Sequence, residues 1–182
     1  MRNFHRDHLQ FSQCGLNCLL CPMRLGEYCP GCGGGEGNQS CAIARCAIEQ
    51  GVGEFCSRCG RFPCERYEKM MEYDSFLPHS RMLRDLERAE ELGLSVYITQ
   101  LEERRSILDR LLAEYNDGRR KSFYILAVYL LEPDTLHRAF DEIQAAVPVE
   151  SPVKEKAIMA VDILKKAAEA DGVTLKLNKK EK

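Results

Sequence analysis

Ten cysteines carry most of the chemistry that this sequence offers, and all of them lie among the first 64 of its 182 residues. Thiols can pair as disulfides, attack as nucleophiles or bind metal ions. The chain begins without the apolar run of a signal peptide, so we expect a cytoplasmic protein whose thiols stay reduced. Free thiols clustered in a reducing compartment favour metal binding over a disulfide framework.

Three pairs of cysteines have the C-x2-C spacing, which lets two thiolates reach one tetrahedral ion. Two of the pairs run into glycine, as CPGCG (29–33) and CSRCG (56–60), the form of a metal-binding knuckle in which glycine relieves the turn. Cys14 and Cys64, at the two ends of the set, can instead be small buried side chains. We therefore predict eight metal ligands, with Cys14 and Cys64 as further candidates: Cys18, Cys21, Cys29, Cys32, Cys41, Cys46, Cys56 and Cys59.

The sequence leaves the partition of these thiols open. Ten thiolates can fill two four-cysteine sites with two left over, or one such site beside a two-zinc cluster held by six. Pairing the two glycine-followed knuckles gives a zinc-ribbon-like site, C-x2-C-x23-C-x2-C. Pairing by proximity gives two other sets, namely Cys18, Cys21, Cys29 and Cys32, and Cys41, Cys46, Cys56 and Cys59.

Zinc is the metal that we expect, as two structural ions, because it needs no assembly machinery. An iron–sulfur cluster in a redox protein is the alternative, since four thiolates also hold such clusters. Cys14, Cys18 and Cys21 even have the C-x3-C-x2-C spacing of radical enzymes. Those enzymes need a large barrel of alternating strands and helices, and no such alternation follows here.

No other residues in the sequence are arranged for catalysis. No Ser, His and Asp, or Cys, His and Asn, follow one another in the order of a known triad, and thiolates bound to zinc are poor nucleophiles. His79 and His137 stand alone, and we expect them at the surface or at helix ends. The sequence therefore predicts a binding protein more readily than an enzyme.

Charge and hydropathy limit the classes of partner that we expect this chain to bind. Residues 1–64 carry six Lys and Arg against five Asp and Glu, and each zinc held by four thiolates adds a charge of −2, which argues against nucleic acid. The longest apolar run, 123–131, is too short to span a membrane. We expect a protein partner and leave the oligomeric state open. The contact side chains would be Arg24, Tyr28, Arg45, Arg58, Arg61 and Phe62.

The sequence pattern around and after the cysteines predicts a mainly α fold. Residues 1–64 would form a small metal-stabilised module of knuckles and short helices, and 65–182 a helical domain with its own core. Apolar spacing predicts helices over 80–92, from Ser95 or Thr99 to 116, over 122–131, from Pro133 to 147 and from 151 to 171. LSVYI (94–98) could instead be a strand, and the alternating tail VTLKLNKK (173–180) resembles an edge strand.

Several motifs together resemble domain-of-unknown-function family 3795, cysteine-rich proteins of bacteria and archaea. The motifs are CGLNCLLCP, CPGCGGG, SCAIARCAIEQGVGEFCSRCGRFPCERYEKM and SFYILAVYLLEPDTL. The most specific part runs from Cys41 to Cys64, while Ala44 and Gln50 stand where basic residues are common in the family. The resemblance implies metal binding, usually of zinc, and no established activity.

Overall fold

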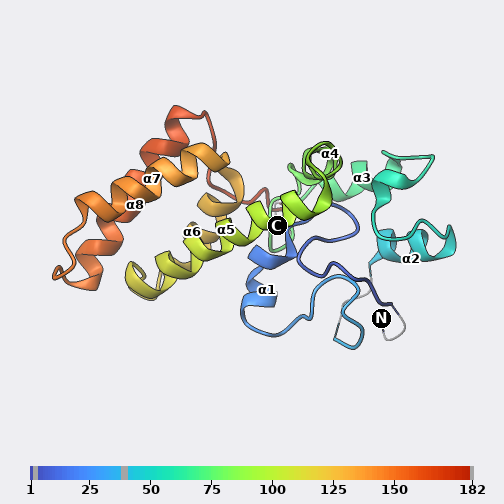
Figure 1. The fold of residues 1–182 in the computed structure, drawn as a ribbon, viewed down its shortest axis with the longest axis horizontal. Helices are drawn as coiled ribbons and strands as arrows, with labels where there is room; N and C mark the ends of the chain where they lie inside the picture. Colours follow the sequence, from blue (N-terminus) through green and yellow to red (C-terminus); the bar gives the residue numbers. More distant parts are fainter. Residues whose placement is uncertain (2–3, 38–40, 181–182) are drawn as a thin grey trace. The chain divides into compact units, whose positions relative to one another are not determined.

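The computed structural model describes residues 1, 4–37 and 41–180, and within these ranges the protein is mainly helical, as predicted (Figure 1). Short elements occupy the cysteine-rich part: the 3-10 turns η1 (Cys18–Leu20) and η2 (Cys56–Arg58), and helices α1 (Pro22–Leu25), α2 (Ala42–Glu49) and α3 (Glu65–Met71). Longer helices follow: α4 (Met82–Leu92), α5 (Leu94–Glu114), α6 (Lys121–Leu130), α7 (Pro133–Ala146) and α8 (Val153–Ala170). No strand forms in the described ranges, where His5 and Gly34 make an isolated β-bridge.

Contacts divide the chain into two compact units, Met1–Leu101 with Leu177–Lys182, and Glu102–Lys176. The predicted division between residues 64 and 65 differs from this one, because apolar side chains on both sides of it share a core. Phe11 packs in the same buried cluster as Tyr67 and Met82. The first unit therefore contains α3 and α4 in addition to the cysteines.

Aromatic side chains form the centre of the first unit. The ring of Phe11 is fully buried, with its centroid 5.3 Å from that of Phe55 and 4.8 Å from that of Tyr97. Gly15 brings the adjacent loop onto α4 with a φ of +95°, and a Cβ there would overlap the carbonyl group of Met82. The loop that carries Cys14 is thus fixed against a helix by direct backbone contact.

Helix α4 ends at Gly93, as the apolar spacing predicted, and α5 begins at once at Leu94. Its start lies one residue from Ser95, which confirms the predicted start near Ser95 and not the alternative start at Thr99. The Thr99 hydroxyl instead donates to the carbonyl oxygen of Ser95 at 3.1 Å inside the helix. The alternative strand over 94–98 is also wrong, because a continuous helix passes through it.

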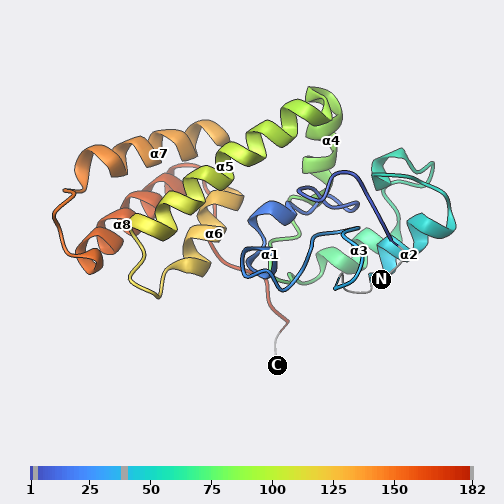
Figure 2. The same cartoon turned by 60° about the horizontal axis from the view of Figure 1, so that its bottom comes forward.

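The second unit consists of the later part of α5 with α6, α7 and α8. Helices α7 and α8 lie side by side (Figures 1 and 2), and α8 also contacts α6. The apolar segment around Tyr124 is a buried helix, as predicted, and the Tyr124 hydroxyl donates to the Tyr115 carbonyl at 2.7 Å. None of the helices in the described ranges is both long and apolar enough to cross a bilayer.

The tail 173–180 does not form the predicted edge strand, since the structure assigns it no strand partner. Asn178 instead exchanges two hydrogen bonds with Asp74. The Asn178 N–H donates to the Asp74 carboxylate at 2.7 Å, and its carbonyl accepts from the Asp74 N–H at 2.7 Å. Lys179 donates to the Ser75 carbonyl at 2.7 Å. These bonds attach the C-terminal segment to the first unit.

His79 was predicted at the surface or at a helix end, and it lies three residues before the start of α4 with its side chain only 5 % exposed. Its Nδ1 lies 2.6 Å from the Met70 carbonyl oxygen, its Nε2 lies 2.8 Å from the Ser75 hydroxyl, and its backbone N–H donates to Asp74 at 2.7 Å. His79 therefore stabilises the loop onto which the tail binds.

Candidate metal centre

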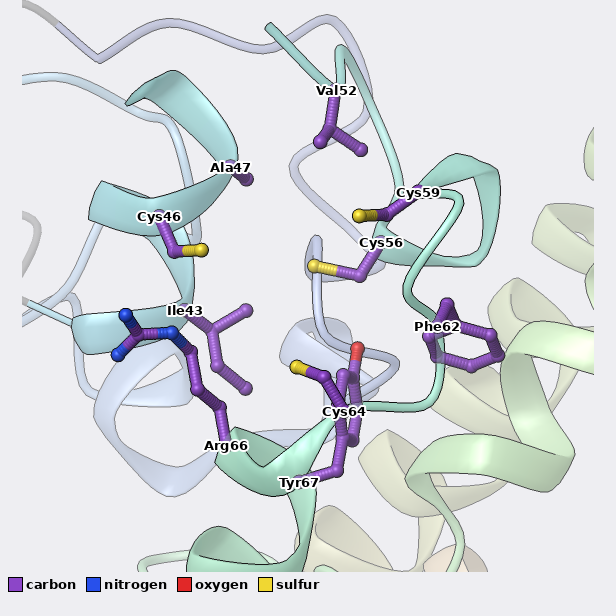
Figure 3. A pocket seen from close by; sticks show the side chains of 10 residues that line it. All are labelled: Ile43, Cys46, Ala47, Val52, Cys56, Cys59, Phe62, Cys64, Arg66 and Tyr67. Atoms are coloured by element: carbon purple, nitrogen blue, oxygen red, sulfur yellow. The ribbon is translucent and has the colours of Figure 1, made fainter. Parts of the chain in front are cut away.

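Four thiols from three neighbouring elements turn toward one space in the first unit (Figure 3). Cys46 comes from α2, Cys56 and Cys59 from the two ends of the η2 turn, and Cys64 from the residue before α3. They line a cavity of about 30 Å³, larger than the roughly 10–15 Å³ that a water molecule needs. We call Cys46, Cys56, Cys59 and Cys64 the four-thiol group.

The η2 turn places two of these thiols by a tight backbone bond, since the Cys59 N–H donates to the Cys56 carbonyl at 2.9 Å. Burial, the largest cause, and thiolate charge on Cys59, Cys64 and Cys46 raise the pKa of Cys56 to about 11, although the nearby Tyr67 hydroxyl lowers it. The four sulfur atoms are thus electrostatic neighbours, and a cation among them would reverse this repulsion.

Tyr67 provides a structural test of whether a metal fits among these thiols. Its side chain is 2 % exposed, and its hydroxyl points into the same cavity without a hydrogen bond of standard geometry (Figure 3). Leaving such a hydroxyl unpaired costs about 1–3 kcal/mol. A metal would keep Cys56 as a thiolate, which accepts hydrogen bonds strongly, so the site fits a thiolate-bound ion.

A second set of thiols, which we call the knuckle group, comprises Cys18, Cys21, Cys29 and Cys32. Burial, the largest cause, and charge on Cys32, Cys21 and Cys29 together raise the pKa of Cys18 to about 12, so these thiols are also neighbours. Backbone N–H groups donate to their sulfur atoms, from Cys32 to Cys18 and from Met23 and Arg24 to Cys21. Amide donors of this kind are typical of metal knuckles.

Cys14 and Cys41 lie beside the knuckle group. Cys14 is 6 % exposed, its sulfur lies 3.2 Å from the Ser12 hydroxyl, and charge on Cys32, Cys41 or Cys18 would raise its pKa, which burial already raises strongly. Cys41 is also an electrostatic neighbour of Cys32. The structure therefore brings Cys41 close to the knuckle group, whereas Cys64 completes the four-thiol group.

Neither predicted partition matches these groups in full. The zinc-ribbon-like pairing differs because the neighbours of Cys56 are Cys46, Cys59 and Cys64. The proximity partition differs because Cys64 stands in the four-thiol group in place of Cys41. Cys41 is the cap residue before α2, and Cys46 lies five residues later inside the helix. At about 100° per residue, the two side chains point roughly 140° apart around the helix axis, that is, to different sides.

Arg6 is a residue of this centre that the sequence analysis missed. Its guanidinium is buried and donates to the carbonyl oxygens of Phe11 at 2.9 Å and Cys32 at 3.1 Å, and its Nη2 lies 3.4 Å from a carboxylate oxygen of Glu54. Its charge lowers the pKa of Cys32 against the effect of burial. Its role could not be predicted from the sequence, because a single arginine in an irregular segment is part of no periodic pattern.

The four-thiol group also reaches the surface. All of its thiols except Cys56 line an open basin of about 450 Å³. Three cationic and two anionic side chains line the same basin, namely Arg61, Arg66 and Lys69, and Glu49 and Glu65. The net positive charge of these side chains would offset part of the net charge of −2 of a zinc ion held by four thiolates.

Of the six side chains predicted as contact residues, four are exposed and two are not. Tyr28, Arg45, Arg58 and Arg61 are exposed. Arg24 and Phe62 are half-buried, and each has an internal role that the sequence did not indicate. Arg24 donates to the Pro30 carbonyl, and the ring of Phe62 packs edge-on against Tyr67 with centroids 5.3 Å apart.

In the described residues no three His, Cys, Asp or Glu side chains already surround one ion position. The fit to a metal therefore depends on the chemistry of the neighbouring thiols, on the cavity and on the unpaired Tyr67 hydroxyl. Comparison of the chain with models of protein families, with curated proteins and with solved structures gives no match. The resemblance to family 3795 stays a prediction from the sequence.

Proposed function

We propose that this protein binds zinc through its cysteine-rich unit and that the metal has a structural role, while exposed side chains around it bind a partner protein. The observation that carries the proposal is the four-thiol group, in which four free thiols and one unpaired hydroxyl line a single small cavity. Free energy of metal binding in such sites is about 10–16 kcal/mol near neutral pH, enough to order a segment with little apolar core.

The partner surface in this proposal lies around the basin and the exposed loops. Tyr28 is 76 % exposed between Cys21 and Cys29, and Arg45, Arg58 and Arg61 are exposed near the four-thiol group. Aromatic and arginine side chains are the types that contribute most to protein interfaces. No reaction is part of the proposal, because bound thiolates are ligands and no other nucleophile adjoins a base within the site.

The first experiment is anaerobic purification followed by measurement of zinc, iron and acid-labile sulfide per chain. Zinc without iron in a colourless sample is the expected result. Iron with equimolar sulfide in a brown sample would overturn the zinc assignment and favour the iron–sulfur redox protein. A chain without either metal would overturn the proposal as a whole.

The structural role has a separate test by hydrogen exchange. Removing the metal with a chelator should greatly speed amide exchange across residues 1–101, most of all across 1–64. The helices of 102–176 should keep their protection, because that unit is compact by itself. Equal exchange rates in the cysteine-rich unit before and after metal removal would contradict a structural role.

A further inference from the structure

A short loop of the first unit, residues 72–76, holds the C-terminal tail mainly through acceptor groups, and we call it the acceptor loop. Its Asp74 pairs with both backbone groups of Asn178. The Asp74 carboxylate accepts from the Asn178 N–H at 2.7 Å, and the Asp74 N–H donates to the Asn178 carbonyl at 2.7 Å. The side-chain amide of Asn178 also donates to the Glu72 carbonyl at 2.9 Å. The loop thus binds one extended residue by its backbone and by its side chain.

Two lysines of the tail extend this contact. The Lys179 ammonium group donates to the Ser75 carbonyl at 2.7 Å, and that of Lys180 lies 5.8 Å from the centre of the Tyr73 ring, within range of a cation–π contact. The acceptor loop, EYDSF, has two carboxylates and no Lys or Arg, whereas the tail residues that it binds, NKK, have two lysines and no carboxylate. The loop and the tail are therefore complementary in charge.

The bonds that shape the acceptor loop come from His79 rather than from the tail. The His79 backbone N–H donates to the second carboxylate oxygen of Asp74 at 2.7 Å, and the ring Nε2 accepts from the Ser75 N–H at 3.2 Å. The ring Nδ1 lies 2.6 Å from the Met70 carbonyl oxygen. Since these bonds do not involve the tail, the loop is already arranged for a ligand, which lowers the entropy cost of binding.

The tail, by contrast, is held by contacts that water can replace. The three tail residues that bind the loop are exposed, and none of residues 173–180 is buried. Segments of this kind open at low cost in free energy. Two rings of the loop also stay in solvent, because Tyr73 is 42 % exposed and Phe76 is 49 % exposed. The tail therefore fills the site only in part.

We propose that the acceptor loop is a docking site for a basic, extended segment of a partner protein, and that the chain's own tail competes for it. The incoming segment pairs its backbone with Asp74, as in strand addition, and places lysines against the Ser75 carbonyl and the Tyr73 ring. An apolar side chain of the partner covers Phe76. The inference names a class of partner for the proposed function, and it does not depend on zinc because no thiol takes part.

The test measures how a fluorescent peptide, VTLKLNKK, which is the sequence of residues 173–180, binds the full chain at low ionic strength. In the wild type the attached tail competes at high effective concentration, so binding should be weak. Lys179→Glu with Lys180→Glu removes the competitor and should tighten peptide binding by about tenfold. Lys165→Glu with Lys166→Glu is the matched control, because it changes the net charge equally at exposed positions of α8 and should leave wild-type affinity.

A third variant locates the peptide on the loop. Adding Asp74→Asn to the Lys179→Glu and Lys180→Glu variant keeps an oxygen for the His79 N–H but turns an amide N–H toward the incoming backbone, so peptide affinity should fall about tenfold.

Equal peptide affinity with and without the two tail substitutions, or no binding to either chain, would overturn this inference and leave the zinc proposal to its own test by metal content. A wild-type dimer that dissociates in Lys179→Glu with Lys180→Glu would overturn the assignment to a separate partner, because the tail of a second copy would then occupy the loop.

Discussion

The hydroxyl group of Tyr67 and the thiol of Cys56 face each other inside the cavity of the four-thiol group (Figure 3). Burial, together with charge on the neighbouring thiolates, raises the pKa of Tyr67 well above its usual range, so the hydroxyl stays protonated and can act only as a donor to a thiolate. Hydrogen bonds to metal-bound thiolates fix their orientation and their basicity. For the proposed zinc site, Tyr67 would therefore act as a positioning residue.

Replacing Tyr67 with Phe should weaken zinc binding at the four-thiol group by about tenfold, the lower end of the range for lost partners of metal ligands. Competition with a chelator of known affinity measures the change. Co²⁺ loading adds a second readout, because the thiolate-to-cobalt absorption band should shift when Cys56 loses its donor.

Tyr124→Phe is the matched control for that variant. It removes a buried hydrogen bond in the second unit and should lower the free energy of unfolding by about 1 kcal/mol without changing zinc affinity. Equal zinc affinity and an unchanged cobalt spectrum in Tyr67→Phe would remove Tyr67 from the metal site.

Arg6→Ala should destabilise the metal-loaded protein by about 3 kcal/mol, because three backbone carbonyls and Glu54 lose a buried charged partner. Glu54→Gln keeps the arginine and its carbonyl bonds, so about 1 kcal/mol is expected there. Urea unfolding followed by circular dichroism suits this chain, which has no tryptophan. Similar losses in both variants would mean that the carbonyl bonds of Arg6 contribute little.

Zinc affinity should rise steadily with pH between 6.5 and 8.5. Burial raises the pKa of Cys18 from 9.0 to about 12 and that of Cys56 from 9.0 to about 11, so both thiols are protonated throughout this interval. Zinc must displace those protons, so its binding should release them to the solvent. Chelator competition at three pH values measures the slope.

A variant tests which protons are involved. Cys56→Ala should lower the slope for its ion by about one proton, because one displaced proton is missing. An affinity that is constant across this pH interval would show that the thiols are already ionised before zinc binds.

Gly15→Ala should cost about 3 kcal/mol of stability. The alanine Cβ would overlap the Met82 carbonyl, and the φ of +95° is unfavourable for any residue with a side chain. Gly51→Ala is the control, because Gly51 has a φ of +63° and open space around it, so only about 1 kcal/mol is expected. Urea unfolding of both variants makes the comparison, and equal losses would show that the loop moves away from α4 easily.

The helices were predictable because local periodicity determines them. The apolar spacing located α4, α6, α7 and α8, and Gly93 and Pro133 mark boundaries that backbone geometry enforces. The start of α5 at Leu94 lies one residue from the predicted start near Ser95, because Gly93 ends α4 directly before it. The prediction of an edge strand in the tail was wrong, because an alternating segment becomes a strand only beside a neighbouring strand, and none forms within the described residues.

The candidate site was predictable in its ligand types but not in its grouping. Spacing identified the pairs around η1 and η2, because two cysteines in one turn must lie together. Which pair meets Cys64 or Cys41 depends on how α2 is rotated in the core, and that follows from tertiary packing of Ile43 and Ala47. Arg6 and Tyr67 gave no signal, since a single buried polar residue has no pattern in the sequence.

The hydrogen bonds between Asn178 and Asp74 can form only late in synthesis, because the two residues are far apart along the chain. The two residues are 104 positions apart, so a ribosome adding ~5–20 residues per second delivers Asn178 roughly 5–20 s after Asp74. All ten cysteines leave the ribosome before that moment. Under the proposed function, the nascent chain can thus bind zinc before Asn178 bonds to Asp74 and attaches its segment to the first unit.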